Sequence, residues 1–147
     1  MPGQVSNAAM ANSTLCLVNA ERTQRHLHQL KLNRRLSRAA GGHAGDMVRQ
    51  DYFSHDSLNG ASFVDRIRRT GYLGGPRAWI VGENLAWGSG DRSTPTSIVR
   101  AWMRSPAHRA NILQRRFREV GIGMALGAPD WPDETAATYA TDFGARS

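Results

Sequence analysis

The chain has 147 residues, 40% of them hydrophobic, and a net charge of +7, which suits one domain with a buried core. It has no apolar run long enough for a membrane-spanning helix, and the first twelve residues lack the features of a secretory signal, so it is either cytosolic or a secreted protein without its leader. The arginines lie in small scattered groups without a nucleic-acid-binding motif, which argues against sequence-specific nucleic-acid binding and leaves weak attraction to anionic cell-wall or membrane surfaces.

The N-terminal segment is small and polar, and we expect a flexible tail over 1–11, followed by a single domain over 12–147. The capping residues at 12–14 predict a helix that starts there and ends near Arg25. Cys16 is the only cysteine, which excludes an intrachain disulfide. Its apolar neighbours predict a small buried hydrophobic side chain and not a catalytic thiol.

One charged residue of this helix falls on its apolar face. Arg22 shares that face with Leu15 and Val18. A charged side chain on an inward face needs a partner, so we expect Arg22 to contact Glu119 or a backbone carbonyl.

Two more helices are predicted before the middle of the chain. After a connector at 26–32, Asn33 caps a helix that continues to about Gln50, with His43 as a packing residue on or beside its apolar stripe. A capping box that begins at Ser62 opens the next helix, which Gly71 ends.

The second half of the chain adds strands. The apolar stretch 79–87 predicts a short strand interrupted at 82–84, and the pair at 94–95 opens another helix. Alternating patterns at 119–124 and 138–143 predict two antiparallel strands. Four or five helices and a small sheet make the fold class α+β, with helices layered on the sheet.

Two titratable residues stand in unusual contexts. Ser105 and Pro106 form a helix start, in which the Ser105 hydroxyl caps the helix and His108 lies in the first turn. The helix dipole then favours a neutral imidazole, which binds a metal or accepts a proton, although a capping or core histidine is the simpler interpretation. Glu83, between apolar neighbours, is either a structural hydrogen-bond anchor or a cleft carboxylate.

Five segments together resemble the CAP superfamily, also called SCP-like, and in particular its prokaryotic branch. The superfamily includes cysteine-rich secretory proteins, insect antigen 5 and plant pathogenesis-related proteins. The segments stand in the family's order: LVNAER at 17–22, YFSH at 52–55, GEN at 82–84, SPAHRANIL at 105–113 and FREVGIG at 117–123.

The resemblance implies an α-β-α sandwich with a central cleft that contains His55, Glu83, Ser105 and His108. It implies that His55 and His108 are the cleft histidines, which bind zinc or another divalent ion in some members. Ser105 stands where many animal and plant members have a second cleft glutamate. This substitution predicts weak metal binding, completed by water.

Two functions are compatible with this resemblance. The first is a secreted, monomeric binding domain whose cleft holds a divalent metal and a lipid, cell-wall glycan or protein ligand without turnover. The second is a metal-assisted hydrolase that uses His55, His108 and Glu83, with Glu83 as the general base. A serine hydrolase is not expected, because the chain lacks a G-x-S-x-G motif.

Overall fold

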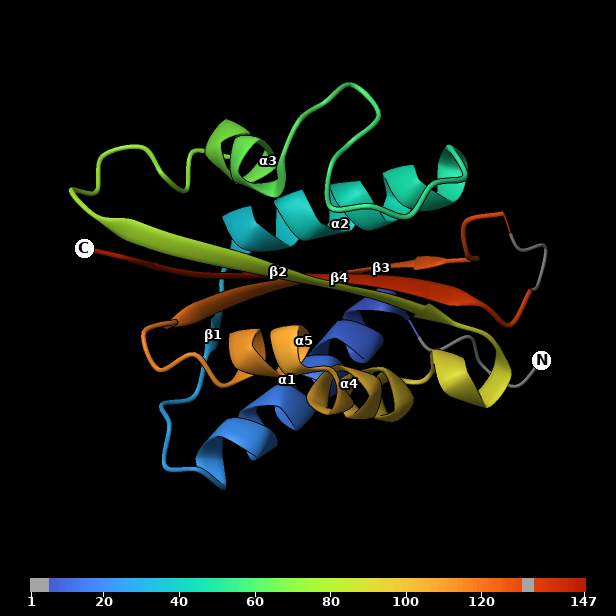
Figure 1. Ribbon diagram of the computed structural model, residues 1–147, viewed down its shortest axis with the longest axis horizontal. Helices are drawn as coiled ribbons and strands as arrows, with labels where there is room; N and C mark the ends of the chain where they lie inside the picture. The colour runs from blue at the N-terminus through green and yellow to red at the C-terminus, as the bar shows by residue number, and fades with distance from the viewer. Residues whose placement is uncertain (1–5, 131–133) are drawn as a thin grey trace.

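The computed structural model describes residues 6–130 and 134–147 and places helices on both faces of one four-stranded sheet. The elements in chain order are α1 (Asn7–Thr23), β1 (Lys31–Leu32), α2 (Arg34–Arg49), α3 (Phe63–Arg69), β2 (Trp79–Gly88), the 3-10 helix η1 (Gly90–Ser93), α4 (Pro95–Arg104), α5 (Pro106–Ile112), β3 (Glu119–Leu126) and β4 (Ala137–Arg146). Helices α2 and α3 cover one face, and α1, α4 and α5 cover the other (Figure 1). The predicted α-β-α sandwich is confirmed. No helix among the described residues is long and apolar enough to cross a bilayer.

The strand order is β1-β3-β4-β2, which leaves β2 at one edge. The two predicted late strands are the antiparallel pair β3 and β4, as expected. The prediction for 79–87 was wrong in one respect, because β2 is continuous and 82–84 does not interrupt it. Each of these three residues pairs with β4. The parallel strand β1 lies inside the predicted connector, and its two residues are too few to show a pattern.

Two glycines of β3 allow the backbone of α2 to lie directly on the sheet. A Cβ atom on Gly121 would lie 2.0 Å from the carbonyl carbon of Leu36, and one on Gly123 would lie 2.2 Å from the amide nitrogen of Gly41. Close contact of this kind excludes any side chain at either position. The glycine-bearing face of β3 is therefore the contact surface for α2.

Helix α1 begins at Asn7, so the predicted flexible tail was wrong for residues 7–11. The hydroxyl of Ser6 accepts a hydrogen bond from the amide of Ala9 and caps the helix earlier than expected. Residues 1–5 of that tail lie outside the described residues. The prediction of a buried Cys16 was also wrong, because its side chain is exposed. Thr14 and Val18 face the core. Cys16 is two positions from each of them, and two positions turn a helix by about 200°, so its side chain points away from the core.

The expected contact of Arg22 is confirmed, with carbonyl oxygens as the partners. Its fully buried guanidinium donates to the carbonyl oxygens of His28 at 2.7 Å, Ile112 at 2.9 Å, Gln114 at 2.9 Å and Phe117 at 3.3 Å. These bonds tie α1 to the segment that follows α5. The carboxylate of Glu119 is bound instead by Asn33 and Tyr72.

Candidate functional site

His55 lies in the loop between α2 and α3, beside the edge strand β2. Its Nδ1 is 2.9 Å from Oε1 of Glu83. The His55 side chain is 52% exposed, whereas the Glu83 side chain is completely buried. His55 therefore presents part of its ring to solvent while Glu83 holds it from behind.

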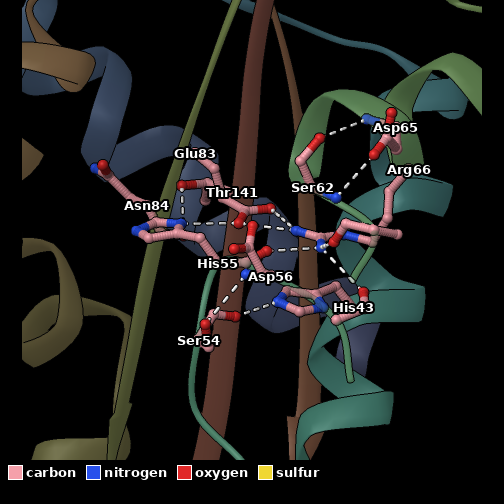
Figure 2. A network of polar contacts seen from close by, with 12 residues as sticks. His43, Ser54, His55, Asp56, Ser62, Asp65, Arg66, Glu83, Asn84 and Thr141 are labelled. Carbon is pink, nitrogen blue, oxygen red and sulfur yellow. Dashed lines mark hydrogen bonds and ion pairs between the residues drawn. The ribbon is translucent and has the colours of Figure 1, made fainter. Parts of the chain in front are cut away.

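Arg66 of α3 binds the same carboxylate, and sequence reasoning did not identify it. Its Nη2 donates to Oε1 of Glu83 at 2.9 Å and to Oε2 at 2.8 Å, as Figure 2 shows. Its Nη1 donates to the backbone oxygen of His55 at 2.7 Å and to the hydroxyl of Ser57 at 3.1 Å. One guanidinium thus fixes both the carboxylate and the loop that carries the histidine.

A second buried carboxyl group lies opposite Glu83, and it was also missed. Asp142 of β4 pairs in register with Glu83 of β2, so the two side chains share one face of the sheet. Both oxygens of Asp142 are buried without a hydrogen-bond donor among the described residues. Burial and the neighbouring Glu83 raise the pKa of Asp142 well above its ordinary value. A proton held on Asp142 makes it the donor to Glu83, which removes the conflict between two acceptors.

The protonation states follow from these contacts. Burial alone would raise the pKa of Glu83, but hydrogen bonds from His55, Asp142 and Arg66 and the positive charge of Arg66 together lower it. Ionised Glu83 can only accept hydrogen bonds, so Nδ1 of His55 carries a proton. The same hydrogen bond raises the pKa of His55. In the neutral ring, Nε2 is the free acceptor.

The next residue of β2 holds the other histidine-bearing segment. Adjacent side chains of a strand point to opposite faces. Asn84 accordingly faces α5, where its Nδ2 donates to the backbone oxygen of His108 at 3.0 Å and its Oδ1 accepts from Asn111 at 2.9 Å. The segment 82–84 thereby links the His55 loop on one side of the sheet to α5 on the other.

His108 lies in the first turn of α5 and is half-buried. Burial lowers its pKa, and positive charge on His55 lowers it further. The neutral state expected for His108 agrees with this direction. The capping role predicted for Ser105 was wrong, because its hydroxyl makes no cap hydrogen bond. Ser105 joins α4 and α5 as the cap residue of both, and its backbone oxygen accepts from Arg109.

His43 of α2 packs against the loop that carries His55, and it is the packing residue that was expected. It is buried in α2, and its Nε2 is 2.7 Å from the backbone oxygen of Ser54, which directly precedes His55. Burial lowers the pKa of His43. Figure 2 shows His43 bound to the backbone of Ser54, the residue before His55.

The carboxylate of Glu83, beside His55, is engaged within the protein. Among residues 6–130 and 134–147, no group of three His, Cys, Asp or Glu side chains is arranged to hold a metal ion. Glu83 is bound by Arg66 and His55, and its side chain is closed to solvent. For a cation, the two histidines would offer Nε2 of His55 and the ring of His108.

Comparisons with known proteins agree with this architecture. The sequence profile of the cysteine-rich secretory protein family (CAP) matches residues 15–138. The uncharacterized protein YkwD of Bacillus subtilis is 33% identical over 133 residues, which make up 90% of this chain and 48% of that protein. The uncharacterized membrane protein YlbC of the same organism is 31% identical over 110 residues, 75% of this chain and 30% of that protein. The chain thus spans half the length of these relatives or less.

Solved structures share the fold. An extracellular protein of Bacillus anthracis that contains an SCP domain superposes with a TM-score of 0.72 and 26% identity, over 96% of this chain and 44% of that one. An outer surface protein of Borrelia burgdorferi gives a TM-score of 0.79 over 100% of both chains at 18% identity. At that identity the second match demonstrates the fold alone.

Proposed function

The chain belongs to the cysteine-rich secretory protein (CAP) family, and we propose that it is an extracellular binding domain that holds its ligand at His55 and His108 without catalytic turnover. Support for the location comes from the similar Bacillus anthracis protein, which is described as extracellular. The ligand class is a divalent cation together with a lipid, a cell-wall glycan or a protein.

The engagement of Glu83 carries this proposal. A general base must reach the proton that it removes, either directly or through one water. Both oxygens of Glu83 accept from Arg66, and its side chain is fully buried. A carboxylate held in this way orients His55 and is poorly placed to activate water. The competing hydrolase would therefore lack its expected base.

The two histidines supply the binding chemistry. Glu83 fixes the Nδ1–H form of His55, which leaves Nε2 as an acceptor, in the way carboxylates orient metal-binding imidazoles. The lowered pKa of His108 keeps the second ring neutral at neutral pH. Two nitrogens with water at the remaining positions predict reversible, weak zinc binding, well below that of a four-ligand structural site.

The test combines zinc calorimetry with a substrate panel. Zinc affinity at neutral pH should drop sharply in His108→Ala, a change that leaves the contacts between Arg66 and Glu83 intact, and should remain in His26→Ala, an exposed histidine elsewhere. Peptide, ester and glycan substrates, with and without zinc, should show no turnover above that of His55→Ala. Zinc-dependent turnover that disappears in Glu83→Gln would establish the hydrolase instead.

A further inference from the structure

Three adjoining hollows lie along α2 and α3, and neither His55 nor His108 is among the described residues that line them. Their volumes are about 530, 310 and 480 Å³. The first two share Gly42, His43, Arg66 and Arg69, and the last two share Arg38, so they form one continuous groove. We call it the arginine groove after its cationic lining residues: Arg34, Arg35, Arg38, Arg49, Arg66 and Arg69.

Negative charge in the groove is scarce. Asp46 is the acidic residue in its lining, and its carboxylate already accepts from Tyr52, Gln50 and Arg49. By contrast, the side chains of Arg34, Arg38 and Arg69 are exposed and make no hydrogen bond or ion pair with any other described residue. The groove thus contains guanidinium groups that form no hydrogen bond or ion pair with the described residues.

The stability of α2 does not explain this arrangement. Arg34 and Arg35 occupy the first turn of the helix, which has no acidic residue, and Arg38 follows one turn later. Cations near a helix N-terminus oppose the macrodipole, and like charges four positions apart repel. An anionic partner would relieve both effects.

We propose that the arginine groove binds a linear polyanion whose phosphate or carboxylate groups repeat along the chain. Guanidinium groups bind both kinds of anion in a bidentate manner. The lining arginines of α2 run from Arg34 to Arg49, which is about 22 Å at 1.5 Å per residue and requires an extended ligand. Two of the three hollows are lined by both α2 and α3, and a hollow between helices fits a narrow chain better than a flat bilayer. No Phe, Tyr or Trp side chain is among the described residues that line the three hollows, so base stacking has no platform.

The decisive comparison uses two triple variants of equal net charge. The groove variant is Arg34→Gln/Arg38→Gln/Arg69→Gln. The control is Arg100→Gln/Arg104→Gln/Arg115→Gln, which removes three exposed arginines from outside the groove, two of them on α4, across the sheet from α2. Both variants retain His55 and His108, so the outcome is separate from the proposed function.

Binding of fluorescent linear polyphosphate and of polyglutamate is measured over a range of salt concentrations. At low salt we expect the groove variant to bind each polymer at least about tenfold more weakly than the wild type does, and the control to lose far less affinity. The slope of log affinity against log salt concentration should fall by about one for each arginine removed from the groove. The thermal midpoint of the groove variant should stay close to that of the wild type, because loss of Arg34 from the first turn of α2 relieves an unfavourable dipole interaction, whereas loss of Arg69 from the last turn of α3 removes a favourable one.

Groove-dependent binding of either polymer supports the proposal, and the preferred polymer identifies the anion. If both variants lost the same amount of affinity for the polymers, net charge alone would explain the binding, and the proposal would be overturned. The proposal would also be overturned if neither polymer bound, or if inorganic phosphate bound as tightly as linear polyphosphate. Tighter groove-dependent binding of oligothymidylate would assign the groove to nucleic acid instead.

Discussion

Removing the guanidinium of Arg66 should expose the electrostatic basis of the site. In Arg66→Met the buried carboxylate of Glu83 loses two hydrogen bonds of 2.9 and 2.8 Å and its permanently charged partner. Deleting one member of a buried ion pair costs about 3–5 kcal/mol of unfolding free energy. His55 and protonated Asp142 still donate to Glu83 in the variant. We therefore expect a loss of unfolding free energy at the lower end of this range, about 3 kcal/mol.

The loss of unfolding free energy in Arg66→Met should depend on pH. In the wild type, Glu83 has a lowered pKa and stabilises the fold above its unfolded value of about 4.3, an effect lost as the pH falls. Without Arg66, burial raises the pKa of Glu83, and protonation removes the unpaired charge. The gap in stability between variant and wild type should therefore narrow as the pH falls from 7 towards 4.5.

Urea unfolding followed by circular dichroism at several pH values measures both effects. Arg69→Met is the matched control, because this arginine lies on the same helix, is exposed and forms no ion pair with a described residue. The control should change the unfolding free energy by less than about 0.5 kcal/mol. An Arg66→Met deficit no larger than that of the control, or one independent of pH, would refute the buried-pair reasoning.

Three further predictions concern the core and the metal. Arg22→Ala should lower the unfolding free energy by about 2 kcal/mol or more, since four carbonyl groups lose their donor; an unchanged urea midpoint would contradict this. Gly121→Ala should cost about 3 kcal/mol or more because a Cβ meets the α2 backbone, and a wild-type melting temperature would argue against that contact. Zinc affinity should fall as the pH drops through the histidine range near 6.5, starting at higher pH for His55 than for His108, because their pKa values are raised and lowered respectively. Calorimetry that gives equal affinity at pH 8 and 5.5 would exclude the histidines as ligands.

Local chemistry explains which helices were predictable. Asn33, Ser62 and Thr94 each cap a helix through their own side chains, and a cap involves only residues next to it in sequence. The start of α1 was missed because Ser6 and the residues at 12–14 are all suitable caps. Choosing among them requires knowledge of how far the helix packs against the sheet.

The histidines and the missed site residues differ in how their roles arise. His55 and His108 stand in recognisable short motifs, whereas Arg66 is locally no different from the exposed Arg68 on the same helix. Its role depends on the position of α3 over β2. The role of Asp142 depends on the register that places it opposite Glu83. Pairing across the sheet is a long-range property, and no periodic pattern in one segment contains it.

The central claim is that Glu83 orients the ring of His55, and the tautomer of His55 tests it most directly. Nitrogen-15 NMR of the imidazole at a pH above its titration should show a protonated Nδ1 and a bare Nε2. The preference should weaken in Glu83→Gln, and zinc should shift the Nε2 resonance in the wild type. A protonated Nε2 in the wild type, or the same tautomer preference with and without the carboxylate, would contradict the claim that Glu83 prepares His55 for binding.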